Sequence, residues 1–429
     1  MSQTNRPAPA ELRAMLLDAR NRTLALTLDL SAGQLRVPLL AIINPPLWEL
    51  GHVAWFQERW CLRHCEGGKR LPSILPDADR FYDSSAVPHD SRWDLPLPGR
   101  EETLAYMEAV LERVLERMEG REGEDANLAY FAQLALYHED MHGEAFWYTR
   151  QTLGYPSPPV AAERRPPGGG ALPGDVAVPG GKFMLGAAVG GGFVFDNEKW
   201  AHEVEIEPFS IARAPVTHAE FAAFVADGGY RRRELWSDAG WKWRGEAGAE
   251  APVYWAKLGN EWRVRRFAEL VPLPLNAPVI HVNWFEAEAW CRWAGRRLPT
   301  EAEWELAAGG AGKRRHPWGE DEFTPERASL DGLSPGCADV AAFAVGDSPF
   351  GCRQMLGNVW EWTADAFLPY PGFTPDPYRD YSQPWFGSHK VLRGGCFATR
   401  ARLVRNTWRN FYTPDRRDVF AGFRSCAIS

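Results

Sequence analysis

The amino-acid sequence predicts a two-domain protein in which an N-terminal four-helix bundle precedes a mixed α+β domain. Apolar residues recur at helical spacing through residues 1–153, and residues 154–175 are rich in proline and glycine without any periodicity. Short β-like runs separated by glycine-rich turns fill residues 176–429. A chain of 429 residues is also too long for one compact core. We therefore expect two domains with these bounds, joined by a linker over 154–175.

Four segments of the first half have the spacing of amphipathic helices. In the first of them, apolar residues fall at i, i+3, i+4 and i+7, and a second stripe repeats this spacing. The predicted helices cover residues 12–19, 48–61, 104–118 and about 128–151. The connection over residues 64–100 is long and aromatic, which is typical of functional loops.

The second half has a different sequence pattern, of short strand-like runs separated by turns. Candidate strands are "KFMLGA", "GFVFDNE" and "HEVEIEPFSIA", and each is followed by turn-forming residues. Helical patterns are few, and the clearest are Thr217–Ala226 and Trp284–Ala294. These features predict an α+β domain with much irregular structure.

Composition excludes several classes of function. A formal net charge of -8 argues against a general nucleic-acid binder. No run approaches the ~18–20 apolar residues that span a bilayer, and the N-terminus lacks the pattern of an export signal. The seven cysteines form no CxxC pair, which favours reduced thiols. We expect a cytoplasmic protein with neither nucleic-acid nor membrane partners.

Two histidines on the last predicted helix indicate a metal site. His138 and His142 continue the apolar stripe of "LYHEDMHGEAF", so both rings face the bundle interior. Buried imidazoles need hydrogen-bond partners or a metal, and rings at i and i+4 converge on one point. A pair of hydrogen-bonded core histidines is the alternative. His52, in "LWELGHVAWFQERW", is the other histidine on a clearly apolar helical face. Three neutral imidazoles leave coordination positions of a bound metal open, and they suit Fe(II) or Zn(II) equally.

At this point the chain resembles a known family. With "GHVAWFQERW" and "HEDMH", the first half resembles the DinB-like bundle of the ergothioneine-type sulfoxide synthases. The second half is similar to the formylglycine-generating-enzyme (sulfatase-modifying factor) fold, which is C-type-lectin-like. The matching segments include "PVTHAEFAAFVADGGY", "GNVWEW", "VLRGGCF" and "FAGFRS". The resemblance implies a non-haem Fe(II) on His52, His138 and His142. It also implies an O2-dependent reaction that joins the imidazole C2 of hercynine to a sulfur or selenium donor.

The resemblance also implies roles for residues of the second half. Tyr378 and Tyr381, in "DPYRDYS", match a tyrosine pair near the iron. Tyr378 would give a proton or hydrogen atom, while Tyr381 would contact hercynine. The segment "RNTWRNFYTPDRRDVFAGFR" is dense in arginine and aromatic residues, which grip carboxylates and attract trimethylammonium groups. Within it, the implied substrate contacts are Asn410, Phe411, Arg416 and Arg417.

Two departures from the family pattern point to the selenoneine synthase branch. Met141 stands where the sulfur enzymes usually have glutamine, and Asn410-Phe411-Tyr412 replaces an Asn-Trp-Asp run. We expect the donor to be a selenosugar, contacted by aromatic faces and hydroxyls. The candidate contacts for this sugar are Phe81, Tyr82, Phe411 and Tyr412.

Other readings of the sequence stay open. One is a sulfoxide synthase of ergothioneine biosynthesis that uses cysteine or γ-glutamylcysteine. Another is a zinc-dependent DinB-type thiol transferase, which needs neither O2 nor the tyrosine pair. A copper oxidase of the formylglycine-generating type would need two adjacent cysteines, but Cys396 and Cys426 lie 30 positions apart. A lectin-like binding module would give the three histidines no purpose.

Overall fold

The computed structural model describes residues 7–64, 71–119, 125–160 and 167–428, and it divides the chain into two compact units. Unit 1 comprises Met1–Thr149 and Pro158–Val160, and unit 2 comprises Arg150–Ser157 and Ala161–Ser429. The boundaries predicted from the sequence, at 153 and 176, stay a prediction. Residues 161–166 of the predicted linker and Cys65 lie outside the described residues.

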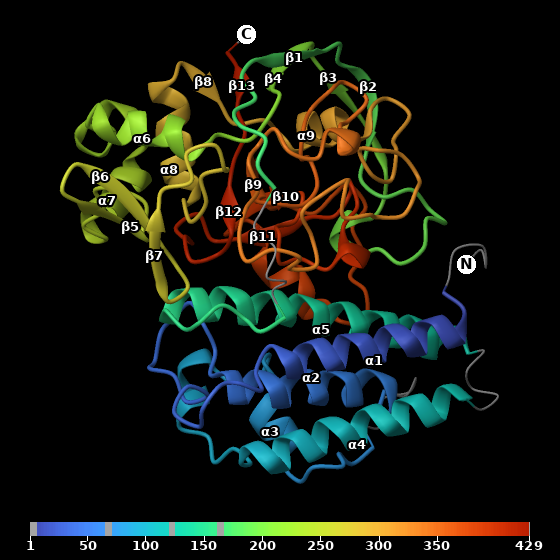
Figure 1. Ribbon diagram of the computed structural model, residues 1–429. Coiled ribbons are helices and arrows are strands. Elements are labelled where there is room, and N and C mark those ends of the chain that lie inside the picture. Colours follow the sequence, from blue (N-terminus) through green and yellow to red (C-terminus); the bar gives the residue numbers. More distant parts are fainter. Residues whose placement is uncertain (1–6, 65–70, 120–124, 161–166, 429) are drawn as a thin grey trace. The chain divides into compact units, whose positions relative to one another are not determined.

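Unit 1 is helical, as predicted (Figure 1). Its long helices are α1 (Pro9–Ala25), α2 (Pro46–Cys61), α4 (Arg100–Glu119) and α5 (Ala126–Leu153). Two short helices, α3 (Ala78–Tyr82) and η1 (His89–Trp93), lie in the long connection between α2 and α4. Proline occupies the first turn of both α1 and α2, where its missing N–H costs nothing. Helix α2 packs against α3 and α4, and α1 packs against α4.

Helix α2 is the core of unit 1. Every residue of it except Arg59 is buried. A helix that is buried on all sides must pair its polar side chains, because an unpaired buried polar group costs free energy. Two of these side chains serve the fold: Gln57 accepts a hydrogen bond from Arg20 at 3.0 Å, and Glu58 accepts one from Tyr106 at 2.7 Å. The other two, Glu49 and His52, belong to the site described below.

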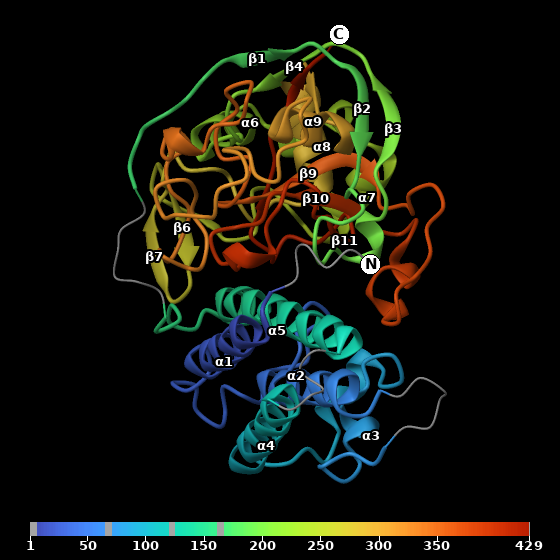
Figure 2. The same cartoon turned by 90° about the vertical axis from the view of Figure 1, so that its right-hand side faces the viewer.

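Unit 2 is a mixed α+β domain, as predicted, and Figure 2 shows its strands and short helices. One sheet has the order β1-β4-β13-β8 and a second has β11-β10-β9-β12. A hairpin β2-β3 and a meander β5-β6-β7 complete the strands of the described part. The strands are β1 (Asp175–Val178), β2 (Gly181–Leu185), β3 (His202–Ile206), β4 (Phe209–Ala212), β5 (Trp255–Leu258), β6 (Glu261–Arg266), β7 (Glu269–Pro272), β8 (Arg296–Arg297), β9 (Trp360–Ala366), β10 (Lys390–Arg393), β11 (Asn410–Tyr412), β12 (Ala421–Gly422) and β13 (Cys426–Ala427).

The helices of unit 2 are short and mostly capped. They are α6 (His218–Ala226), α7 (Asp238–Glu246), α8 (Trp284–Trp293) and α9 (Glu301–Gly309). Capping boxes begin α6, α8 and α9, in which a Thr or Asn side chain and a Glu three residues later satisfy the first N–H groups. The sequence patterns predicted α6 and α8 and missed α7 and α9.

The prediction of a strand at "GFVFDNE" was wrong. Its last residues form the 3-10 turn η3 (Asp196–Glu198) instead. The Glu198 carboxylate accepts a hydrogen bond from the backbone N–H of Phe195 at 3.0 Å, which closes the turn. A side chain bonded to the backbone of a residue nearby in sequence competes with strand pairing.

The core of unit 2 contains ion pairs that fix the strands. Arg393 of β10 and Arg409 both pair with Glu301, at 2.9 and 2.6 Å, and Arg424 pairs with Glu361 of β9 at 2.6 Å. All five side chains are buried. Removing one partner of such a pair leaves an uncompensated charge, so these residues hold the ends of β9, β10 and β11 firmly.

Two further findings concern the expected cellular context. None of the six cysteines that the structure describes forms a disulfide. Among the described residues, no helix combines the length and the hydropathy that a membrane span requires.

Candidate metal centre

Three histidines of unit 1 meet in its core. His52 comes from α2, and His138 and His142 come from α5; within the described part of the chain, they form the group of potential metal ligands. One ring nitrogen of each lies within 4.8 Å of the others. The Nε2 atoms of His52 and His138 are 3.3 Å apart. The structure therefore brings together the three residues that the sequence analysis selected.

Hydrogen bonds at Nδ1 orient two of the three rings. His52 Nδ1–H donates to the backbone carbonyl of Tyr82 at 2.8 Å, and His142 Nδ1 contacts the Glu49 carboxylate at 3.0 Å. A carbonyl and a carboxylate only accept hydrogen bonds, so a neutral ring bonded in this way carries its lone pair on Nε2. Both lone pairs thus belong to the nitrogens that a metal would use, an arrangement typical of metal-binding histidines.

The site keeps two of its imidazoles, those of His52 and His138, neutral. Burial lowers the pKa of His52 well below 6.5, and the neighbouring His142 lowers it further. Burial, followed by the charges of His142 and His52, lowers the pKa of His138 in the same direction. Neutral imidazole is the form that ligates a transition metal.

Aromatic rings hold the ligands from the sides. The Trp48 ring stacks on His52 with centroids 4.7 Å apart, and Phe56 stacks on His138 at 3.6 Å. Arg92 belongs to η1, in the long connection, and its guanidinium lies 4.0 Å from the centroid of the Trp48 ring. These contacts leave little freedom for either ligand.

The alternative of hydrogen-bonded core histidines fits less of this geometry. A hydrogen bond between the Nε2 atoms of His52 and His138 would require the second ring to carry its proton on Nε2. Such a bond accounts for two of the three rings, whereas a cation accounts for all three lone pairs at once. The donor set, three imidazoles with two of them held at Nδ1, fits a divalent transition metal.

One of the two acidic residues of "HEDMH" has a structural role. Glu139 forms a buried ion pair with Arg20 of α1, with Nε and Oε1 2.8 Å apart. It thereby links α1 to α5 and holds the helix that carries His138 and His142. Met141, on the same helix, is half-buried.

Sequence reasoning missed three groups that support the triad. These are the Glu49 carboxylate, the Tyr82 carbonyl and Gly51. Gly51 has no side chain, and a Cβ atom at this position would lie 2.2 Å from the Tyr82 ring. Glu49 is the one group with a local signal, because it lies one turn before His52 on an almost wholly apolar helix. Phe81 and Tyr82, predicted to contact a sugar, are buried, and their carbonyls accept hydrogen bonds from Trp48 and His52.

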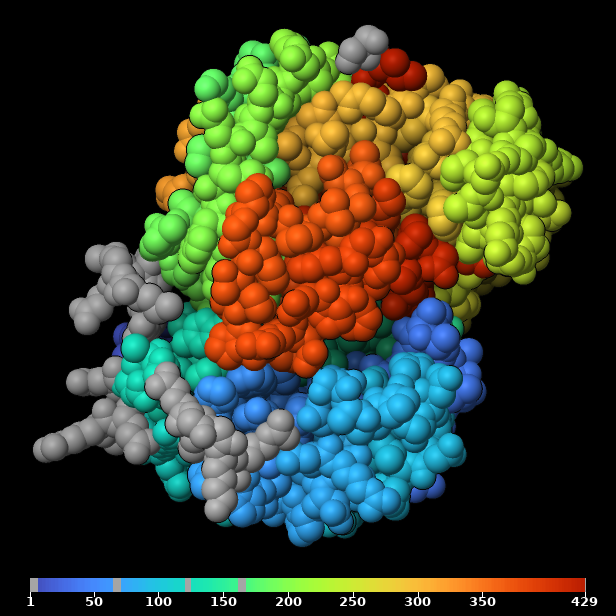
Figure 3. Space-filling model, turned by 180° about the vertical axis from the view of Figure 1, so that it is seen from behind, coloured from blue at the N-terminus to red at the C-terminus, as the bar shows by residue number. Residues whose placement is uncertain are grey.

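The predicted residues of unit 2 form a second group. Tyr378 caps the 3-10 turn η7 (Arg379–Tyr381), and the rings of Tyr378 and Tyr381 lie 6.3 Å apart. Tyr381 meets the edge of Phe411 at 5.9 Å. The region around residues 350–390, orange in Figure 3, covers a continuous part of the surface of unit 2.

The other predicted contacts lie on or after β11. Asn410 accepts a hydrogen bond from the Phe411 N–H, and Phe411 stacks on Phe367 at 4.1 Å. Arg416 forms a two-pronged pair with Asp418 at 2.6 and 2.7 Å and lies 5.0 Å from the centroid of the Tyr412 ring. Arg417 instead packs on Trp243, 5.3 Å from its ring centroid. The structure thus gathers Tyr378, Tyr381 and Phe411, while Arg417 lies against α7.

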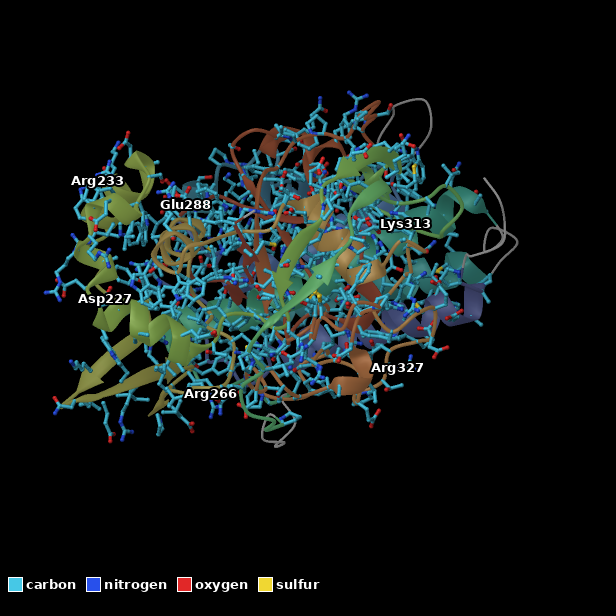
Figure 4. All side chains as sticks on the ribbon, turned by 90° about the horizontal axis from the view of Figure 1, so that it is seen from above. Asp227, Arg233, Arg266, Glu288, Lys313 and Arg327 are labelled. Carbon is cyan, nitrogen blue, oxygen red and sulfur yellow. The ribbon has the colours of Figure 1, made fainter. Side chains whose placement is uncertain are left out.

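Unit 2 also holds a cavity of about 540 Å³, and none of these residues is among those that line it. His218, His281 and Arg266 line it, and Figure 4 labels Arg266 beside the β5-β6-β7 meander. Burial lowers the pKa of both histidines to about 3. They are therefore neutral at physiological pH, and they form no group of three ligands among the residues described.

Comparisons with known proteins agree with this architecture. The DinB superfamily model matches residues 15–146, and the sulfatase-modifying factor enzyme 1-like domain model matches residues 162–428. The hercynine oxygenase of Mycolicibacterium thermoresistibile is 41% identical over 430 residues, covering 97% of this chain and 95% of its own. The chain belongs to the hercynine oxygenase family.

Two further proteins are similar to this chain in sequence. The hercynine oxygenase of Mycolicibacterium smegmatis is 38% identical over 95% of this chain and 96% of its own. The formylglycine-generating enzyme of Streptomyces coelicolor is 38% identical over 63% of this chain and 95% of its own. The family resemblance drawn from the motifs, with its two-domain fold, is confirmed.

Proposed function

We propose that this chain is an iron(II)- and O2-dependent enzyme that joins the imidazole C2 of hercynine to a selenium or sulfur donor. The convergence of His52, His138 and His142, two of them buried and the third half-buried, is the observation that carries the proposal. The proposal of hercynine rests on relatives named hercynine oxygenase that match nearly the whole chain.

The three histidines would hold the iron through Nε2, with Glu49 and the Tyr82 carbonyl fixing two of the rings. Fe(II) bound there would supply the electron transfer to O2 that the imidazoles cannot supply. The three-histidine set leaves coordination positions open, as a site for exogenous groups requires.

The overall reaction balances with O2 as the oxidant. The C2–H bond of hercynine and the proton of the donor are lost, and a carbon–chalcogen bond and a chalcogen–oxygen bond form. These changes release four electrons, which reduce O2; one oxygen atom ends in the product and the other in water. Tyr378 would hold a proton at its Oη and deliver it during this reduction. Tyr381, Asn410, Phe411, Arg416 and Arg417 are the proposed hercynine and donor contacts.

We propose a selenosugar as the donor. Met141 and Tyr412 stand where the sulfur enzymes usually have glutamine and aspartate, and Phe411 keeps an aromatic face in place of tryptophan; aromatic faces suit a sugar. Phe81 and Tyr82 belong to the same proposal, although their buried rings make them supporting rather than open surfaces. Cysteine or γ-glutamylcysteine is the second candidate donor, and the three hercynine oxygenase relatives favour a reaction of this general type.

Metal analysis tests the proposed iron site, and turnover of the zinc form distinguishes the iron enzyme from a zinc-dependent thiol transferase. Protein loaded with Fe(II) without oxygen should bind one iron, and His138→Ala should lose most of it. His316→Ala removes an equally buried imidazole outside the triad and should keep the iron. Full iron content in His138→Ala would overturn the assignment. Turnover by the zinc form in the absence of O2 would favour a thiol transferase.

Competition tests the donor. Hercynine, O2 and the iron-loaded protein are offered equal amounts of selenosugar, cysteine and γ-glutamylcysteine, and the products are separated by mass spectrometry. A selenium-containing product should dominate. Preferred conversion of either thiol would refute the selenium donor and leave the oxidative coupling in place.

A further inference from the structure

A short segment of unit 2, Phe195–Lys199, lies against both chain segments to which we assign substrate contacts. It contains the turn η3 and precedes β3. Phe195, Asp196, Asn197 and Glu198 have exposed fractions of 2% or less. We call this segment the 195–199 bracket.

The bracket holds the chain on both sides of Tyr378. On one side, the ammonium of Lys199 pairs with Asp376 at 2.6 Å. On the other side, the Ser382 hydroxyl donates a hydrogen bond to the carboxylate of Asp196. Both contacts cross more than 170 positions of sequence, so they fix this segment in space rather than shaping it locally.

An aromatic contact adds a third attachment. The Phe195 ring stacks on Tyr381, with centroids 4.3 Å apart and an interplanar angle of 21°. Tyr381 in turn neighbours Tyr378 at 6.3 Å and Phe411 at 5.9 Å. The position of the tyrosine pair therefore depends on the bracket.

The bracket also holds the residues that lead into β11. The Glu198 carboxylate pairs with Arg405 and accepts a hydrogen bond from Thr407 at 2.8 Å. Arg409 donates to the backbone carbonyl of Asn197 at 2.8 Å. Asn410, the first residue of β11, follows directly.

Stability alone does not account for the bracket. Within the described structure, Oδ2 of Asp196 and both side-chain amide atoms of Asn197 are buried without a hydrogen-bond partner. Burial raises the pKa of Asp196 to about 6, so the fold accepts a carboxyl group that would prefer solvent. Unsatisfied buried polar groups of this kind are uncommon and call for an explanation beyond packing.

We propose that the 195–199 bracket positions Tyr378 and Tyr381 for the oxidative coupling, with Asp196 and Phe195 as its positioning residues. This inference rests on the role proposed for Tyr378. Displacing a reacting group by about 1 Å costs on the order of a hundredfold in rate, so loss of one attachment should slow coupling more than it weakens hercynine binding.

Ser382→Ala and Asp196→Ala each remove one attachment, and Asp196→Asn keeps an acceptor oxygen for Ser382. Ser334→Ala is the matched control, because this buried hydroxyl donates to a carbonyl at 2.8 Å elsewhere in unit 2. The measurements are the rate of trypsin cleavage after the exposed Arg379, the KM for hercynine, and the ratio of coupled product to simply oxidised donor. Circular dichroism confirms that each variant is folded.

Cleavage after Arg379 should become roughly tenfold faster in Ser382→Ala and Asp196→Ala. Coupling should slow roughly tenfold to a hundredfold, with KM changed less than threefold and products shifted toward the oxidised donor. Asp196→Asn should recover most of the coupling, and Ser334→Ala should resemble the wild type. Wild-type products in both Ser382→Ala and Asp196→Ala would overturn the proposal, whatever their cleavage rates.

Tyr378→Phe is measured alongside these variants. Unchanged products in Tyr378→Phe would refute the role of Tyr378 itself. The products and coupling rates of Ser382→Ala and Asp196→Ala decide separately whether the bracket positions this segment, so the two failures are distinguishable.

Discussion

Gly51→Ala is expected to weaken metal binding without touching a ligand. Gly51 lies in α2 next to His52, and the new Cβ would lie 2.2, 2.3 and 2.4 Å from three atoms of the Tyr82 side chain. Real Cβ atoms essentially never show contacts that short, so either the Tyr82 ring or the helix must shift. Tyr82 is wholly buried and its carbonyl accepts the hydrogen bond from His52 Nδ1 at 2.8 Å. Moving this residue therefore disturbs the group that orients the ligand.

The magnitude follows from two opposing effects. Overpacking a well-filled core costs about 1–3 kcal/mol, while replacing glycine with alanine inside a helix contributes about 1 kcal/mol of stability. The net loss of unfolding free energy without metal should thus be about 0–2 kcal/mol. Disturbing a hydrogen bond to a metal-binding histidine typically weakens metal affinity by about 10–100-fold. Affinity should therefore change more clearly than stability.

The assay is an anaerobic Fe(II) titration combined with urea unfolding, with and without metal. Gly143→Ala is the control: it also replaces a helical glycine, next to His142, but its Cβ would meet only Leu26 at 3.8 Å. That variant should bind iron normally and gain up to about 1 kcal/mol. Gly51→Ala/Tyr82→Leu should recover part of the lost affinity, because the ring is gone. Equal iron affinity in Gly51→Ala and Gly143→Ala would show that the Tyr82 carbonyl does not hold His52.

Glu49→Gln should lower iron affinity about 10–100-fold, measured by the same titration, because the amide carries no charge to favour the proton on His142 Nδ1. Undiminished affinity would leave Glu49 as packing only. A third prediction concerns pH: His218 and His281 have folded-state pKa values of about 3, against an ordinary value of 6.5. Between these values the unfolded chain binds protons that the folded chain excludes, so stability is full above 6.5 and falls as the pH drops. At about pH 5.5 each histidine should cost about 1.4 kcal/mol of unfolding free energy, so the fall in urea unfolding between pH 7.5 and 5.5 should be about 1.4 kcal/mol smaller in His218→Gln than in the wild type. Parallel curves for His218→Gln and the wild type would contradict the assignment.

The helices of unit 1 could be predicted because their signal is local. Apolar residues at helical spacing define the four long helices, and the histidines of α5 could be placed inside the bundle because they continue its stripe. His52 followed from the same reasoning on α2. In each case the residues that determine the burial lie within one helix.

The rest of the site could not be predicted because its contacts join distant parts of the chain. His142 and Glu49 are 93 positions apart, and His52 and the Tyr82 carbonyl are 30 apart. A backbone carbonyl has no sequence signal at all. In unit 2, α9 begins with Thr300 and Glu303, a capping pair that the sequence does contain, but the helix is too short for a clear apolar stripe.

The polar residues of α2 show how the fold and the site share one helix. Gln57 and Glu58 are buried and bonded to partners that hold the bundle together. Glu49 is equally buried, but among the described residues its second oxygen, Oε2, has no hydrogen-bond partner. A buried carboxylate in this state costs free energy, and hydrophobic residues would pack there at lower cost. A cation held by His52, His138 and His142 would place positive charge beside the Glu49–His142 pair and offset that cost. The Glu49 oxygen without a hydrogen-bond partner is therefore a feature of α2 that a bound metal would account for.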